Sequence, residues 1–357
     1  MHERILLQSS ANKDKAQLLN ILGNISLERY QTSHVIEDLN QAVCAYHDAV
    51  RDGQAGAPYL SDLGIAPAHR FERLGDLSNI NKSVLMFKDA VQLTPEGHPN
   101  KPTMLSGLGM SLLSRFERLG NLSDLNKSIL MFEDTVRLTP DGHPDKPSRL
   151  SNLGNSLFRH FEQFDNLSDL NKSVLISEDA VRLTPEGHPD KPSMLSNLGS
   201  SLLGRFEWLG DLSDLNKSVL MAEDAVRLTP DSHPDKPLRL SNLGNSLLGC
   251  FEQLGNLSDL NKSILMFEDT VQLTPDGHPD KPVMLNNLGN SLFCCFEQLG
   301  DLSNLNKSVL MKEDAVRLTP DGHPDKPSRL RNLGNLLFSC FEQLGDLSDL
   351  NKSVLMN

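Results

Sequence analysis

A 45-residue repeat runs through most of this 357-residue chain and constrains its fold more than any other feature. The tripeptide Asn-Lys-Ser recurs at this interval, beginning at Asn81, Asn126, Asn171, Asn216, Asn261, Asn306 and Asn351. Segments 211–255 and 301–345 differ at only 8 of 45 positions. The chain is therefore predicted to be a row of one structural unit rather than two or three unrelated domains.

Each unit is predicted to form two helices. In the unit that starts at residue 146, apolar residues share one helical face at Leu150, Leu153, Leu157 and Phe161. Asp145 is the predicted cap of this helix, and Ser168, like Ser123 one unit earlier, is the predicted cap of the second. Pro185 ends the second helix, and no segment shows the sustained alternation of a strand.

A single helix pair cannot bury both of its apolar faces, so neighbouring pairs are predicted to stack into an all-α solenoid. The predicted array covers residues 15–345, with degenerate first units, and residues 1–14 are interpreted as a polar N-terminal extension. Residues 346–357 hold only part of a second helix. An uncapped half-repeat predicts that the chain is a fragment and that it self-associates through this end.

Composition narrows the class of function. The formal charge is −13 at pH 7, which argues against nucleic-acid and anionic-membrane partners. No stretch has the length of a transmembrane helix, and the N-terminus lacks the apolar core of a signal peptide. Five cysteines are too few for a disulfide scaffold of this size. These features predict a soluble, cytoplasmic protein.

The unit resembles a tetratricopeptide repeat, whose signature has Leu-Gly between two aromatic positions in the first helix and a Pro after the second. The matching residues are Leu150, Leu153, Gly154 and Leu157 in the first helix, and Ser128, Phe132 and Pro140 in the second. Leu replaces both aromatic residues. The resemblance covers residues 15–345 and implies a right-handed superhelix.

The long tetratricopeptide arrays of mushroom-forming fungi are the most similar in their His-Pro-Asp-Lys-Pro and Asn-Leu-Gly-Asn runs. Such arrays often precede a caspase-like (CHAT) peptidase domain. The sequence contains no such domain, so the resemblance implies no peptidase activity, and no other enzyme motif is found.

Two columns of metal-binding residue types have a structural interpretation. A histidine before proline recurs at His98, His143, His188, His233, His278 and His323, and a cysteine recurs at Cys250, Cys295 and Cys340. Equivalent atoms in adjacent units are expected about 10 Å apart, too far for a shared zinc ion or a disulfide. We interpret the histidines as loop residues and the cysteines as helix packing, and expect no metal or cofactor.

The near-identical units differ most along one face of the first helix. Four variable columns begin at Thr103, Ser106, Met110 and Ser114, a spacing that places them on one face. In tetratricopeptide arrays the matching face lines the concave groove that receives peptides. A surface without packing constraints is the equally weighted alternative. A fifth column on the second helix ends in Lys312, which predicts partial burial at most.

Asparagines beside this face form the candidate binding site. One column, the asparagine ladder, comprises Asn152, Asn197, Asn242, Asn287 and Asn332, and three more asparagines are Asn155, Asn245 and Asn290. The column departs from the pattern at Ile21, Asp62 and Gly107. It resembles the asparagine ladders of kinesin light chain and O-linked N-acetylglucosamine transferase, which bind peptide backbone. An amide has the donors and the acceptor for this. The alternative is that these asparagines brace adjacent repeats.

Three functions remain open from the sequence. The favoured one is a non-catalytic scaffold that binds an extended peptide or a partner protein in its groove. The second is the regulatory arm of a caspase-like peptidase whose catalytic domain is not in this chain. The third is a structural spacer or self-assembling rod.

Overall fold

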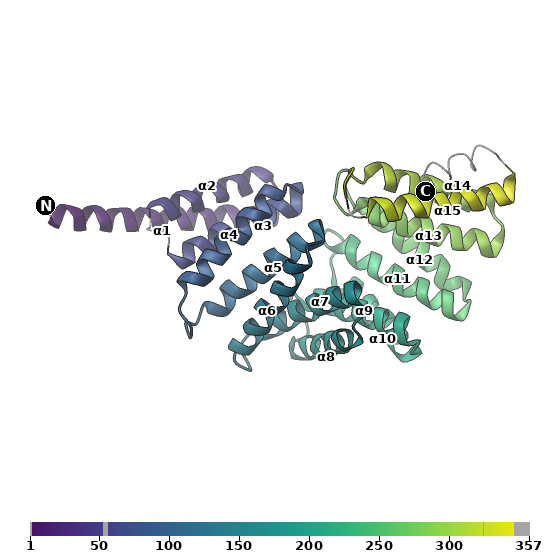
Figure 1. The fold of residues 1–357 in the computed structure, drawn as a ribbon, viewed down its shortest axis with the longest axis horizontal. Coiled ribbons are helices and arrows are strands. Elements are labelled where there is room, and N and C mark those ends of the chain that lie inside the picture. Colours follow the sequence, from purple (N-terminus) through teal and green to yellow (C-terminus); the bar gives the residue numbers. More distant parts are fainter. Residues whose placement is uncertain (1, 53–55, 324, 346–357) are drawn as a thin grey trace. The chain divides into compact units, whose positions relative to one another are not determined.

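The computed structural model describes residues 2–52, 56–323 and 325–345. Over these residues the regular structure consists of fifteen α-helices and no strands (Figure 1). The chain divides into two compact units, residues 1–163 and 164–357. The predicted all-α class is thus confirmed, and the helices follow one another in consecutive pairs.

The helices have nearly constant lengths after the first pairs. The first unit holds α1 (His2–Ser33), α2 (Ile36–Asp52), α3 (Ala57–Leu74), α4 (Leu77–Leu93), α5 (Lys101–Leu119), α6 (Leu122–Leu138) and α7 (Lys146–Phe164). The second unit holds α8 (Leu167–Leu183), α9 (Lys191–Leu209), α10 (Leu212–Leu228), α11 (Lys236–Leu254), α12 (Leu257–Leu273), α13 (Lys281–Leu299), α14 (Leu302–Leu318) and α15 (Lys326–Leu344). Odd-numbered helices are the first helices of their pairs, and even-numbered helices are the second.

The N-terminal boundary differs from the prediction. The helix expected to begin near Lys15 begins at His2, so the predicted extension is the first part of α1. Residues 2–14 contain neither glycine nor proline, so nothing in them ends a helix. The predicted half-repeat 346–357, and the self-association expected of it, lie outside the described residues.

The predicted caps of the second helices were wrong by two residues. The side chains of Asn121 and Asn166 cap α6 and α8, accepting hydrogen bonds from the backbone N–H of Ser123 (3.0 Å) and Ser168 (3.1 Å). An Asn side chain reaches the N–H two residues on as well as a Ser does, so the Asn takes the cap and the helix begins earlier. The carboxylate of Asp145, the other predicted cap, accepts a hydrogen bond from Arg149 at 2.9 Å.

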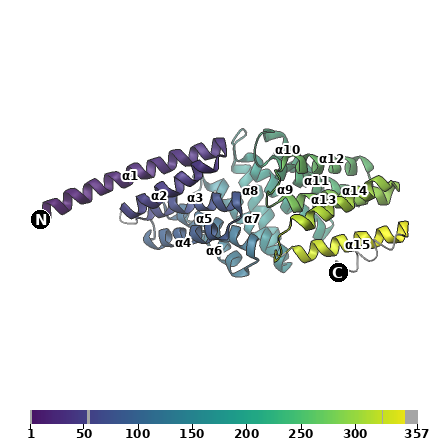
Figure 2. The ribbon, with the colours of Figure 1, turned by 90° about the horizontal axis from the view of Figure 1, so that it is seen from above.

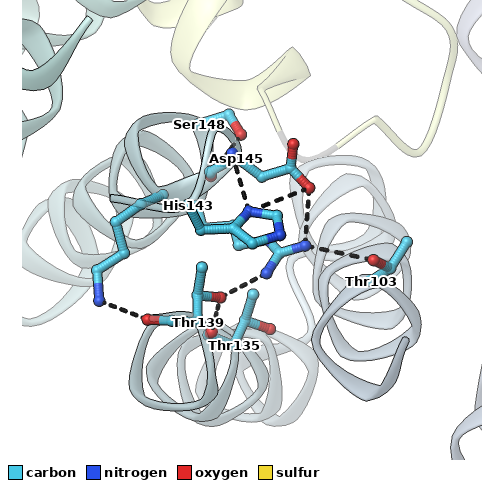
Figure 3. Close-up of polar contacts among 8 residues, drawn as sticks. Thr103, Thr135, Thr139, His143, Asp145 and Ser148 are labelled. Atoms are coloured by element: carbon cyan, nitrogen blue, oxygen red, sulfur yellow. Dashed lines mark hydrogen bonds and ion pairs between the residues drawn. The ribbon is translucent and has the colours of Figure 1, made fainter. Parts of the chain in front are cut away.

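The histidine column shapes the loops between helix pairs, and Figure 3 shows one member, His143, with its partner Asp145. The backbone N–H of His143 donates to the carbonyl of Pro140, closing a turn in which Gly142 has a φ of 83°. Nδ1 of the His143 ring accepts a hydrogen bond of 3.1 Å from the backbone N–H of Asp145. The same ring-to-backbone bond recurs at His98, His188, His233, His278 and His323. The histidines therefore act as loop residues, as predicted.

A lysine ties each of these loops to the helix before it. Nζ of Lys146 donates to the carbonyls of Val136 (3.1 Å) and Thr139 (2.9 Å) at the end of α6. Equivalent bonds recur for Lys101, Lys191, Lys236, Lys281 and Lys326. A cation on the carbonyls of the last helical turn stabilises the negative end of the helix dipole.

Core clusters join the two helices of a pair to the first helix of the next pair, as Phe206 of α9, Leu215 of α10 and Cys250 of α11 do. Phe267 of α12 packs on Leu288 and Leu292 of α13, and equivalent clusters occur in both units. Phe267 belongs to the fifth variable column, whose members are all buried. Lys312 at the end of that column is only 7% exposed, so the predicted partial burial was wrong. Its stem lies against Gly289 in the space that a Phe ring fills elsewhere.

The described helices contain no segment that is both long and apolar enough to span a membrane. The cysteine column is buried, with Cys250, Cys295 and Cys340 exposed by 7%, 4% and 3%. This agrees with the packing role inferred for it.

Candidate peptide-binding face

The asparagine ladder occupies one register position on successive first helices. Asn152 lies in α7 of the first unit, and the other four lie in the second unit, in α9, α11, α13 and α15. All five residues are partly buried. Side chains in this position can contact both the neighbouring repeat and a bound molecule.

Two ladder amides contact the preceding repeat. Nδ2 of Asn242 donates to Oγ of Ser196 at 2.8 Å, and Nδ2 of Asn287 lies 3.5 Å from Oδ1 of Asn245. The first contact uses one of the two N–H donors of the Asn242 amide and leaves its carbonyl out of the bond. Such contacts are those expected if the asparagines brace adjacent repeats, and each involves only the nitrogen of the ladder amide.

The face around the ladder in the second unit is polar with exposed apolar side chains beside it. Asn245 and Asn290, in the third variable column, are partly buried, as is Asn155 in the first unit. Leu238 of α11 is 52% exposed and Val283 of α13 is 42% exposed, both in the first variable column. An extended peptide on this face would meet amides and apolar side chains together.

Two of the three positions where the ladder departs from Asn, Asp62 and Gly107, have local explanations. Gly107 lies against the ring of Phe87, which occupies the space a Cβ would need. Asp62 accepts a hydrogen bond of 2.8 Å from Nδ2 of Asn20 in α1, so it already serves an inter-repeat contact. Burial raises the pKa of the Asp62 carboxyl, and the Asn20 bond opposes that rise. The ladder position therefore tolerates several ways of joining repeats.

The fourth variable column includes Cys294, whose thiol is unsuited to nucleophilic chemistry. Burial, followed by the nearby carboxylates of Glu252 and Glu297, raises the pKa of Cys294 to about 11, although Lys312 opposes the rise. A thiol with this pKa is protonated at neutral pH, and the thiolate is the reactive form. Cys294 is thus a weak candidate for catalysis.

A buried arginine clamp in alternate repeats was not predicted from the sequence. Arg149 donates through Nη1 to Thr139 and through Nη2 to Asp145 (2.9 Å) and to Thr103 of the preceding repeat (3.3 Å) (Figure 3). Arg239 makes the same contacts, with Ser193 in place of Thr103, and Arg329 makes the first two. Burial lowers the pKa of all three guanidinium groups, and the neighbouring aspartates oppose this.

The alternation itself is visible in the sequence. The column reads Met104, Arg149, Met194, Arg239, Met284 and Arg329, a period of two repeats. In two of the methionine repeats the threonine hydroxyl contacts the methionine sulfur instead of an arginine. Oγ1 of Thr184 lies 2.7 Å from Sδ of Met194, and Oγ1 of Thr274 lies 2.9 Å from Sδ of Met284.

Arginine–aspartate pairs inside two repeats were also missed. Nε and Nη2 of Arg115 donate to the two carboxylate oxygens of Asp124, at 2.7 and 2.8 Å. The same atoms of Arg205 donate to the carboxylate of Asp214, at 2.6 and 2.7 Å. The partners are nine residues apart, on the two helices of one pair, a separation that no single-helix pattern reveals. These bidentate pairs fix the helix hairpin.

Comparison with known proteins identifies the class of fold. No family model and no curated protein matches the chain. Among solved structures, a tetratricopeptide repeat protein from Parabacteroides merdae matches with a TM-score of 0.52 and 11% identity, over 90% of this chain and 99% of that one. Human IFIT1, solved as a dimer with PPP-AAAA, matches with a TM-score of 0.52 and 12% identity, over 97% of this chain and 81% of its own.

At these identities the comparisons establish the fold alone. The chain is an α-solenoid of tetratricopeptide type, which confirms the fold that the repeat pattern predicted. The resemblance to fungal arrays that precede peptidase domains stays a prediction.

Proposed function

We propose that the chain is a non-catalytic scaffold that binds an extended peptide segment of a partner protein along the asparagine ladder. The observation that carries the proposal is the second unit's face, where partly buried asparagines lie beside exposed Leu238 and Val283. Amides can pair with peptide N–H and C=O groups, and apolar side chains can bind alternate peptide side chains.

A peptide partner fits this face better than a nucleic acid does. The chain carries a net charge of −13, and phosphate binding needs clustered cations that the ladder lacks. The IFIT1 match is at 12% identity, so its ligand does not transfer. Free, buried cysteines support the cytoplasmic location that we propose with this function.

The test is selection from a displayed library of random linear peptides, followed by calorimetric titration of the selected peptides. The decisive variant replaces three ladder residues together: Asn197→Ala, Asn242→Ala and Asn287→Ala. The matched control replaces three exposed asparagines of second helices: Asn216→Ala, Asn261→Ala and Asn306→Ala. We expect the ladder variant to lose at least tenfold in affinity and the control to bind normally.

Thermal unfolding separates binding from bracing. Each lost inter-repeat hydrogen bond is expected to cost about 1 kcal/mol, which leaves the array folded. A ladder variant that binds selected peptides as tightly as the wild type would refute the proposal, as would a selection that yields no binding peptide.

A further inference from the structure

An exposed apolar stripe follows one face of α1, the helix at the N-terminal end of the first unit. Its members are Leu18, Ile21, Leu22 and Ile25, which are exposed by 67%, 46%, 41% and 50%. Their spacing of three and four residues puts them on a single face. The opposite face of the helix is buried against the first unit at Ala16 and Leu27, exposed by 0% and 9%. The stripe is therefore continuous and outward-facing.

The repeat itself shows that this face is normally covered. Leu22 occupies the column of Leu63, Leu108, Leu153, Leu198, Leu243, Leu288 and Leu333, which are exposed by only 1–8%. In each interior repeat the second helix of the preceding pair covers this column, as Val84 and Phe87 of α4 cover Leu108. Residues 2–13 do not fold back over the stripe of α1, because they continue the same helix, which extends past the other helices of the unit (Figures 1 and 2).

Charges at the two ends of the stripe indicate what covers it. Asp14 lies four residues before Leu18, and Arg29 lies four residues after Ile25, so both extend the same face. Both are exposed, the Arg29 side chain by 63% even though it also pairs with Asp38. The face thus has an acidic end, an apolar centre and a basic end.

Such a face is complementary to itself in one orientation only. If two α1 helices pair antiparallel about the midpoint between Ile21 and Leu22, residue i lies opposite residue 43 − i of the other copy. Leu18 then meets Ile25, and Asp14 meets Arg29, twice. A parallel pair would instead set Asp14 against Asp14 and Arg29 against Arg29.

Two Asp14–Arg29 pairs therefore flank the apolar centre of one two-fold contact. An isologous contact of this kind closes on itself and yields a dimer rather than a fibre.

We propose that this chain forms an antiparallel homodimer through the α1 stripe, in which Leu18, Ile21, Leu22 and Ile25 of two copies cover one another. The contact is small, so the dissociation constant is expected to be on the order of micromolar. It is independent of the asparagine ladder.

The test is sedimentation velocity of the full chain over a concentration series. We expect a monomer–dimer equilibrium that Leu22→Glu shifts at least tenfold toward monomer. The matched control is Leu130→Glu, which changes a leucine of α6 that is even more exposed (56%, against 41% for Leu22) and should leave the equilibrium unchanged. Asp14→Lys, which sets a lysine opposite Arg29, should weaken the dimer severalfold at low salt.

Cysteine cross-linking in a Cys44→Ser background tests the orientation. Leu18→Cys and Ile25→Cys chains should form a disulfide when mixed, and Leu18→Cys alone should not, because its two copies are about 10 Å apart along the helices. A wild-type chain that stays monomeric at every concentration overturns the proposal. So does a dimer that Leu22→Glu leaves intact, or a self-linked Leu18→Cys chain.

Discussion

The hydroxyl of Ser218 in α10 lies 2.7 Å from the hydroxyl of Ser246 in α11. Ser218 also donates to the carbonyl of Gly199, 2.8 Å away in α9, so one buried side chain links three helices across two repeats. Ser218 is the serine of an Asn-Lys-Ser tripeptide. The same inter-repeat pair recurs between Ser83 and Ser111, at 2.8 Å, and between Ser263 and Ser291, at 3.4 Å.

Ser218→Ala should lower the free energy of unfolding by about 1–3 kcal/mol, because it removes a hydroxyl that bonds buried groups of both α9 and α11. Ser128→Ala is the matched control, since the Ser128 hydroxyl bonds the carbonyl of Leu125 in its own helix at 2.8 Å. Chemical denaturation followed by circular dichroism measures both. Equal losses would show that the inter-repeat link is not what the serine contributes.

Two glycines of the Leu-Gly column should respond differently to replacement by alanine. A Cβ at Gly244 would lie 2.9 Å from the ring of Phe267, whereas at Gly199, where Ala222 replaces the Phe, its nearest neighbour would be 3.4 Å away. Gly244→Ala should destabilise by about 1–3 kcal/mol through overpacking. Gly199→Ala should be neutral or stabilise by up to about 1 kcal/mol, because Ala favours helix. The thermal unfolding midpoints of the two variants test this prediction. A loss of stability in Gly199→Ala as large as that in Gly244→Ala would contradict the packing described.

Replacing Lys312 with Phe should stabilise the array, by about 1–3 kcal/mol at neutral pH. Burial lowers the pKa of the Lys312 ammonium below its ordinary 10.5, although Cys294 opposes this. The penalty for burying the charge is fully present below the folded-state pKa and fades as the pH rises toward 10.5.

The stability advantage of Lys312→Phe should therefore shrink between pH 7 and pH 10. Lys307→Met, at an exposed lysine of the same helix, is the control and should have little effect at either pH. An advantage that grows with pH would mean that the ammonium is not the group responsible.

Asp165 follows α7 with a φ of 53°, where most other repeats have a glycine near 70°. Non-glycine residues are strained in this region, so Asp165→Gly should stabilise by about 1 kcal/mol. The reverse change, Gly210→Asp at a φ of 72°, should destabilise by a similar amount. Differential scanning calorimetry of the two variants tests the pair, and a destabilising Asp165→Gly would point to a role for the Asp165 side chain.

The repeat made most of the fold predictable. Period and apolar spacing located the helix pairs, and Lys146 and its equivalents marked where the first helices begin. A residue that recurs in every unit can be either buried or exposed, however, so recurrence alone does not distinguish the two. Ser218 recurs as regularly as the exposed asparagine two residues before it, so its burial was not visible.

The site was less predictable because its geometry depends on neighbouring repeats. Asn242 and Ser196 are 46 residues apart, and their contact arises from stacking, not from local pattern. Lys312 was misjudged for a related reason. Charge alone suggested exposure, but a long aliphatic stem can fill an apolar gap.

The most direct test of the account is a backbone N-methyl scan of a peptide selected on the wild-type chain. If ladder amides pair with peptide backbone, methylating a contacted N–H removes its donor and should weaken binding about tenfold, by roughly 1.4 kcal/mol. The losses should fall at several positions, and they should diminish in the Asn197→Ala, Asn242→Ala and Asn287→Ala variant. A peptide whose affinity survives every N-methylation would contradict recognition of the backbone by the asparagine ladder.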